Sequence, residues 1–198
     1  HSEKVFIMNR LLLILILTFS FQTWTIANDF KEFQIEGMSI GDSALDFFDK
    51  SILENGKELN WYDTKIFTPI RDIELDNAKT YVSFQLAVKS DDNNYIIESV
   101  AGFVYYKNNI NKCYQKLDGI GLEIKKLFKN IKSEKRNYKH SGDKSGKSTI
   151  RDIIFLDNRK NQITIACYDW SKKMKYWDQL RISISTKEYR DWIKIAYD

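Results

Sequence analysis

The strongest constraint on this fold is the stretch from Ile96 to Ile131, where an apolar strand runs into a long amphipathic helix. Residues 96–106 are apolar at nearly every position, which is typical of a strand in the interior of a sheet. Apolar residues then recur at steps of three and four from Ile110 to Ile131, which predicts one helix with a single buried stripe. Asn108 or Asn109 is placed to cap that helix.

Two cysteines are expected to face the core around this helix. Cys113 lies on its apolar stripe, and Cys167 alternates with Ile163 and Ile165 on one face of a later strand. In an oxidising compartment such a pair favours a disulfide, which stabilises by about 4 kcal/mol on the chain-entropy model. Two buried free thiols are the alternative. Gly121 also lies on the stripe, where glycine costs about 1 kcal/mol relative to alanine, so we expect another element to cross closely there.

The first residues have the pattern of a secretory signal peptide. Arg10 precedes an almost unbroken apolar run over residues 11–21, and Thr25 and Ala27 then occupy the small-residue positions of a cleavage site. We interpret residues 1–27 as upstream residues and a signal peptide cleaved after Ala27, which predicts a periplasmic or secreted protein. A membrane anchor is disfavoured because the apolar run is shorter than the roughly 20 residues that a spanning helix needs. Residues 1–7 are interpreted as lying outside the natural protein.

The composition argues against several classes of protein. One proline and eight glycines in 198 residues are untypical of a disordered or low-complexity chain. A formal charge of +4 is too small to indicate a nucleic-acid binder, and no nucleic-acid partner is expected. Removal of the signal peptide would leave residues 28–198 as a single α+β domain with no transmembrane anchor. His140 is its only histidine, so neither a metal site nor a cofactor is expected.

The periodicity of the whole chain predicts an α+β fold. The first helix is expected over Ala44 to Ile52 and is ended by Asn55 and Gly56. A capping box from Ser185 to Glu188 begins a C-terminal helix. Strands are predicted at Leu59 to Phe67, Thr80 to Lys89, Ile96 to Tyr106, Thr149 to Leu156, Gln162 to Trp170 and Gln179 to Ser185. We expect an antiparallel sheet with helices on one face, and two helix-plus-three-strand repeats are a hypothesis.

Some runs resemble known proteins. Residues Ile35 to Ser43 resemble the start of the first helix in small exported proteins of the SmpA and beta-lactamase-inhibitor-like folds. The chain as a whole is similar to uncharacterised exported proteins of marine alphaproteobacteria, through Gly37 to Ser43, Asp143 to Ser148 and the Asp169-Trp170-Ser171 corner. The second resemblance implies export and no known activity.

Two stretches are candidates for binding. The basic stretch from Lys125 to Lys147 would suit an anionic partner such as lipid headgroups or an acidic protein face, and its candidate contacts are Lys135, Arg136 and Lys139. The alternative is a solvated helix end and loop. Trp170, Tyr176 and Trp177 flank a polar loop, where such rings form a sugar platform or a protein-binding hot spot. The alternative is that they cover one edge of the core.

Three patterns could belong to an enzyme, but none is a complete catalytic motif. Gly146-Lys147-Ser148 resembles the end of a phosphate-binding loop, yet Ser141 replaces the first glycine of that motif and a strand is predicted to follow. His140 has no nucleophile in a recognisable strand-turn setting. The remaining pattern is a group of carboxylates on the exposed side of the first helix, Asp42, Asp46 and Asp49.

The sequence therefore predicts an exported envelope protein that acts as a non-catalytic binding or interaction module. Its partner is expected to be an envelope protein or an anionic surface. One alternative is a hydrolase that uses His140 or a carboxylate pair. Another alternative is a peripheral membrane-surface binder that acts through Lys125 to Lys147, and such binding would be released by salt.

Overall fold

The computed structural model describes residues 30–59, 62, 65–107 and 109–196, so the predicted signal peptide and its cleavage point lie outside the described residues. Seven antiparallel strands form one sheet in the order β1-β2-β3-β7-β6-β5-β4. The strands are β1 (Phe67–Ile73), β2 (Ser83–Lys89), β3 (Ile97–Tyr105), β4 (Lys132–Lys139), β5 (Thr149–Leu156), β6 (Gln162–Asp169) and β7 (Gln179–Ser185). The helices are α2 (Lys50–Asn55), α3 (Ile110–Leu127) and α4 (Lys187–Ala196).

The sheet consists of two meanders that meet at one strand pair. The first meander is β1, β2 and β3, and the second is β4, β5, β6 and β7. Their shared pair runs from Ser99 opposite Ser185 to Tyr105 opposite Gln179, so β3 is an interior strand as predicted. Between the meanders, α3 carries the chain from β3 to β4 at the far edge. The predicted α+β class, antiparallel sheet and C-terminal helix are confirmed.

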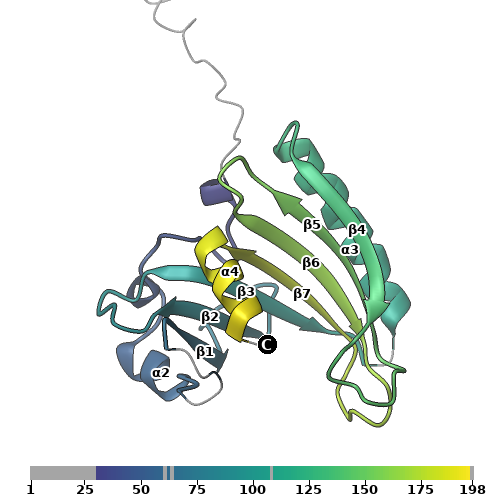
Figure 1. Cartoon of the computed structure of the whole chain (residues 1–198), viewed down its shortest axis with the longest axis horizontal. Helices are drawn as coiled ribbons and strands as arrows, with labels where there is room; N and C mark the ends of the chain where they lie inside the picture. The colour runs from purple at the N-terminus through teal and green to yellow at the C-terminus, as the bar shows by residue number, and fades with distance from the viewer. Residues whose placement is uncertain (1–29, 60–61, 63–64, 108, 197–198) are drawn as a thin grey trace, which may run out of the picture.

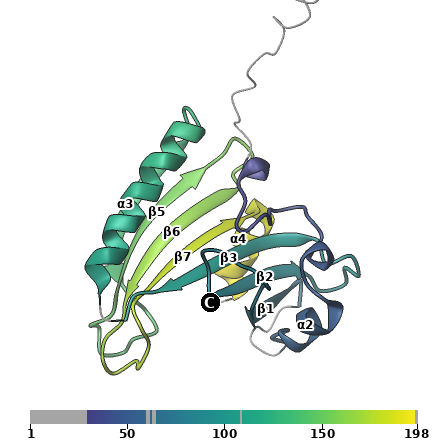
Figure 2. The same ribbon diagram turned by 180° about the vertical axis from the view of Figure 1, so that it is seen from behind.

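The two faces of the sheet are covered differently. Helix α3 lies on one face of β5, β6 and β7, and residues 30–56 cover the same face over β1, β2 and β3. We call this the core face. Helix α4 lies on the opposite face, in front of the sheet in Figure 1, whereas α3 comes to the front in Figure 2. The helices are thus distributed over both faces, because β7 leads directly into α4 on the side away from the core.

The core face is packed by the stripe that the sequence predicts on α3. Its buried residues are Cys113, Leu117, Gly121 and Ile124. A Cβ atom added at Gly121 would lie 2.7 Å from Cδ1 of Ile153 on β5, which confirms the expected close crossing. Asn109 caps the helix by accepting a hydrogen bond from the Lys112 N–H at 3.3 Å.

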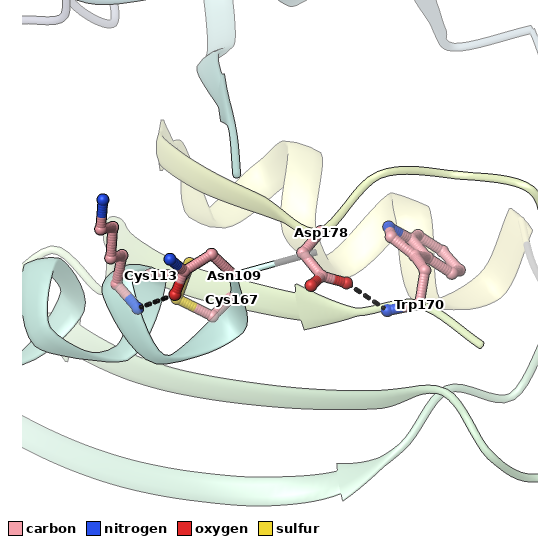
Figure 3. The surroundings of a disulfide bond; sticks show 6 residues. Asn109, Cys113, Cys167, Trp170 and Asp178 are labelled. Atoms are coloured by element: carbon pink, nitrogen blue, oxygen red, sulfur yellow. Dashed lines mark hydrogen bonds between the residues drawn. A yellow bond between two sulfur atoms is a disulfide. The ribbon is translucent and has the colours of Figure 1, made fainter. Parts of the chain in front are cut away.

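The predicted disulfide is present. The sulfur atoms of Cys113 on α3 and Cys167 on β6 are bonded, and their Cα atoms are 6.0 Å apart. Both residues are fully buried in the core. Figure 3 shows the bond joining the beginning of α3 to the strand that ends just before Trp170. The staple therefore fixes the helix to the strand from which the candidate binding loop begins.

Two predicted elements have different bounds in the structure. The helix expected from Ala44 to Ile52 is divided into a 3-10 turn at Ala44–Asp46 and the short helix α2, although Gly56 ends α2 as expected. Residues 60, 61, 63 and 64 of the predicted strand from Leu59 to Phe67 lie outside the described residues, and β1 begins at Phe67. Pro69 is accommodated within β1 because this strand is at an edge, where a missing N–H breaks no ladder bond.

The stretch predicted as a helix end and loop contains the strand β4. All eight of its residues are exposed, so no apolar face marks it as a strand in the sequence. Backbone pairing with β5, from Lys132 opposite Leu156 to Lys139 opposite Thr149, holds it in place. Charged side chains on both faces suit an edge strand, because they oppose pairing with another chain. The second half of the domain thus has four strands, and not the three of the hypothetical repeat.

Candidate functional site

A large hollow lies on the α4 face of the sheet. It has a volume of about 840 Å³ and extends over the ends of β3 and β7 and the loop between β6 and β7. We call it the aromatic groove. Its aromatic lining consists of Phe103, Tyr105, His140, Trp170, Tyr176 and Trp177.

Strand alternation and one loop bring these rings together. Phe103 and Tyr105 are two residues apart on β3, so both point to the α4 face. The three residues predicted from the sequence, Trp170, Tyr176 and Trp177, lie in the loop between β6 and β7. The structure therefore places the predicted aromatic run on one wall of the groove and two unpredicted rings on its floor.

A buried carboxylate closes the base of this loop. Asp178 is 7% exposed and accepts a hydrogen bond from the Trp170 N–H at 3.1 Å, as Figure 3 shows. The carbonyl oxygen of Asp178 accepts another from the Tyr106 N–H at 2.7 Å. Asp178 raises the pKa of Asp169, although burial of Asp169 is the larger cause. The two ends of the loop are thus joined to each other, and Asp178 joins them to Tyr106 just after β3.

Ring contacts continue along the wall. The Trp170 ring stacks on Tyr168 at 5.6 Å between centroids and lies 4.6 Å from His140 and 5.0 Å from Tyr176. At the other end, the Trp177 ring lies 5.8 Å from that of Tyr105. His140 is therefore one member of an aromatic cluster.

The rings nearest solvent are unusually exposed for their size. Tyr176 is 61% exposed, Trp177 is 51% exposed and Tyr105 is 41% exposed. The ammonium of Lys107 lies 4.9 Å from the centre of the Trp177 ring, in a cation–π arrangement. Trp170 is partly buried beside the other rings of the groove, whereas Tyr176 and Trp177 face solvent.

The loop at residues 140–148 contacts the β6–β7 loop that carries the groove rings. Asp143 is 5% exposed and accepts hydrogen bonds from the hydroxyls of Ser145, Ser148 and Ser171 at 2.6–2.9 Å. The N–H groups of Ser145 and Ser148 also donate to it, both at 2.9 Å. The hydrogen bonds from Ser148, then Ser145 and Ser171, hold the pKa of Asp143 well below its usual value, although burial opposes them. Asp143 thus joins the loop at 140–148 to Ser171, next to Trp170.

This arrangement accounts for the run that resembles a phosphate-binding loop. In such a loop the backbone N–H groups point at a phosphate, but here the N–H groups of Ser145 and Ser148 point at the carboxylate of Asp143. Gly146 has a φ of +66°, which favours glycine in the turn. The run is therefore a structural turn that contains its own anion, and the strand β5 follows it as expected.

Among the described residues, no carboxylate is hydrogen-bonded to His140. Its Nδ1 accepts a hydrogen bond from the Gly142 N–H at 3.0 Å, which assigns the proton of a neutral ring to Nε2. In a Ser-His-Asp triad the carboxylate accepts a hydrogen bond from the Nδ1–H of the histidine, whereas Nδ1 of His140 is itself an acceptor. No group of three His, Cys, Asp or Glu side chains within the described residues could hold a metal ion.

The three basic candidates are not brought together. The Lys135 ammonium contacts Asp118 of α3 at 2.6 Å and lies toward the core face. Arg136, the next residue, points the other way and makes two hydrogen bonds to Asp152, at 3.0 and 2.6 Å. Asp152 is 1% exposed and also accepts a hydrogen bond from the Tyr138 hydroxyl at 3.0 Å. Lys139 is exposed beside the turn at Gly146.

Two sets of functional candidates were missed by sequence reasoning. Phe103 and Tyr105 lie in a strand that is apolar on both faces, so their direction is not visible without knowing the covered face. Arg71, which also lines the groove, was not singled out because it is an isolated cation in its strand.

Comparison with known proteins adds no relative. No family model, curated protein or solved structure matches this chain. None of the helices in the described part of the chain combines the length and the apolar character needed to cross a bilayer. The resemblances noted in the sequence stay predictions, and a functional proposal has to rest on the site itself.

Proposed function

We propose that this protein is a non-catalytic binding module of the cell envelope, whose aromatic groove holds an acidic polypeptide segment of a partner protein. The observation that carries the proposal is the convergence of six rings on one groove of about 840 Å³. Exposed tryptophan and tyrosine side chains beside a cleft are typical of binding hot spots, because each supplies a large contact area with few rotatable bonds.

Charge around the groove supports an acidic partner. Asp72 is the only acidic side chain among the described residues of the lining, which also includes Arg71 and Lys175. The carboxylates of Asp143 and Asp178 are buried in hydrogen bonds. The exposed residues of the two neighbouring loops include five cations, Lys144, Lys147, Lys172, Lys173 and Lys175. Such a rim favours segments that combine acidic and apolar side chains.

The disulfide supports placing this activity outside the cytoplasm. Disulfides persist in oxidising compartments, and the bond between Cys113 and Cys167 is buried in the core. Export is tested by the intact mass of the protein from the envelope fraction of an expressing cell, with thiols alkylated before any reduction. A mass beginning at Asn28 without alkyl groups is expected. A chain that retains Met8 to Ala27, or that takes up two alkyl groups, would contradict export.

The binding proposal is tested by selecting from a random peptide library displayed on phage, with the folded protein as bait. We expect enriched sequences that combine acidic with aromatic or aliphatic residues, and weaker binding as salt rises. A neutral oligosaccharide array is screened in parallel. Enrichment of basic or uncharged peptides, or binding to oligosaccharides alone, would overturn the proposal.

Two variants locate the binding to the groove. Trp177→Ala is expected to weaken the selected peptide by about tenfold or more, because truncated hot-spot tryptophans cost at least 1–2 kcal/mol. Leu127→Ala is the matched control, since Leu127 is 67% exposed on α3 and lies away from the groove. Circular dichroism checks that both variants are folded. Equal affinities for wild type and Trp177→Ala would remove the groove as the site.

A further inference from the structure

A second hollow on the α4 face has a different chemistry. It has a volume of about 220 Å³ and lies between α4 and the strands β1, β2, β3, β7 and β6. We call it the arginine pocket, because Arg71, Arg181 and Arg190 line it. Arg71 also borders the aromatic groove, but the other two arginines belong to the pocket alone.

Alternation along the strands makes this pocket polar. On β7, Arg181, Ser183 and Ser185 line the pocket, while Leu180, Ile182 and Ile184 point to the core and are at most 3% exposed. The neighbouring strands supply matching hydroxyl and amide groups at the paired positions. These are Ser99 on β3, Gln85 on β2, and Gln162 and Thr164 on β6.

The described lining of the pocket contains no carboxylate, since neither aspartate nor glutamate is among those residues. Within the described residues, Arg181 and Arg190 make no ion pair. Elsewhere on this face the protein does provide a carboxylate, since Arg136 is paired with Asp152. The arginine pocket therefore differs from the site of Arg136, where a buried carboxylate balances the cation.

The N–H groups of the Arg181 and Arg190 guanidinium groups outnumber the hydrogen-bond acceptors around them. Arg181 donates to Gln85 Oε1 at 3.5 Å, and Arg190 donates to Gln162 Oε1 and to the Lys160 carbonyl, both at 2.6 Å. Each guanidinium has five N–H groups, and the Nε atoms of both are buried without an acceptor among the described residues. Burial also lowers the pKa of Arg190, although Asp191 and Asp157 oppose that shift.

We propose that the arginine pocket binds the oxyanion group of a small phosphorylated or sulfated molecule. Two guanidinium groups with unused donors and several hydroxyls offer more hydrogen bonds than a single carboxylate can accept, whereas a tetrahedral oxyanion accepts with three or four oxygens. The bound group would supply a negative charge that the described lining of the pocket lacks. Binding here does not depend on a ligand in the aromatic groove, so this site goes beyond the proposed function.

The test is isothermal calorimetry of the folded protein with inorganic phosphate, sulfate and glycerol phosphate, with chloride holding the ionic strength constant. Saturable binding of at least one of them is expected, with a dissociation constant below about 10 mM. Preference for glycerol phosphate would identify a phosphate ester, and preference for an inorganic ion would identify the free oxyanion. Absence of saturable binding by all three would overturn the proposal.

Matched variants assign the binding to the pocket. Arg181→Gln and Arg190→Gln are each expected to weaken binding by about tenfold or more, because each removes charge-assisted hydrogen bonds. Lys116→Gln removes the same charge from an exposed position on α3 and is expected to leave binding unchanged. Ser183→Ala keeps the charge, so it decides the matter where an arginine variant does not fold. Binding unaffected by Ser183→Ala and by the folded arginine variants would place the oxyanion elsewhere.

Discussion

The two faces of the sheet are made from alternate residues of the same strands, yet they have opposite chemistry. On β6, Ile163, Ile165 and Cys167 are fully buried on the core face, while Gln162 and Thr164 line the arginine pocket on the other. The core face is closed by α3 and residues 30–56, whereas α4 leaves a groove and a pocket open. Alternate residues of one strand thus serve either the core or the two hollows. Substitutions at neighbouring positions should therefore have different effects on stability and binding.

The largest effect is expected from the staple on the core face. Replacing both Cys113 and Cys167 with serine should lower the free energy of unfolding by about 4 kcal/mol, because the bond closes a loop with a sequence separation of 54. Urea unfolding with and without reductant measures it. Reductant should reproduce the loss in the wild type and leave the variant unchanged. A loss below about 1 kcal/mol would show that the core face does not depend on the bond.

Neighbouring residues of β6 give the most direct comparison of the faces. Ile165→Ala should cost about 3 kcal/mol, because it removes methyl groups from a fully buried site and leaves a cavity. Thr164→Ala should cost about 1 kcal/mol or less, since it removes one hydroxyl that accepts from Gln162 at 2.7 Å. Chemical denaturation gives both values. Equal losses would contradict the assignment of stability to the core face.

Neighbouring cations of β4 give a smaller difference in stability. Here the residue on the α4 face is expected to matter more than the one on the core face. Arg136→Ala should destabilise by about 2 kcal/mol, because among the described residues it leaves the buried Asp152 with the Tyr138 hydroxyl as its one side-chain partner. Lys135→Ala should change stability by less than about 0.5 kcal/mol, since its ion pair with Asp118 is half exposed. Thermal melts at low and high salt measure both effects. A larger loss for Lys135→Ala would reverse the expected ranking.

The smallest global effect is expected at Asp143, and it depends on pH. The folded pKa lies below the usual value of about 4, so the carboxylate stabilises the fold above that pH and loses this contribution as the pH falls below it. The urea midpoint of the wild type, followed by tryptophan fluorescence, should therefore fall as the pH is lowered from about 5 to about 3, because the unfolded chain binds the proton more readily than the folded one. Asp143→Asn should show a weaker pH dependence over this range. An identical profile would contradict the role of Asp143.

Much of the core face could be predicted from the sequence. The stripe on α3, the close approach at Gly121 and the bond between Cys113 and Cys167 all follow from local periodicity, because a helix and a strand direct their side chains in a fixed order. The predicted helix over Ala44 to Ile52 is wrong in its continuity, since Ser43 begins a 3-10 turn and α2 starts only at Lys50. The capping box predicted from Ser185 to Glu188 is replaced by a single cap at Thr186, whose hydroxyl accepts from the Tyr189 N–H at 3.2 Å.

The candidate site was only half visible. Trp170, Tyr176 and Trp177 are close in sequence and stood out as a group, whereas their partners Phe103 and Tyr105 come from a strand about 65 residues earlier. The grouping of Lys135, Arg136 and Lys139 fails for the opposite reason. They are close in sequence, but the alternation of β4 points Lys135 and Arg136 to opposite faces.

By itself, the sequence determined the secondary-structure class, the buried stripe and the pairing of the cysteines, because these depend on residue spacing within single elements. The tertiary structure alone decided where α4 lies, and with it the two hollows on that face. Long-range pairing of β3 with β7 brings Ser99 beside Ser185 and Tyr105 beside Gln179. No local pattern encodes such a pairing, since it results from the packing of two meanders around one core.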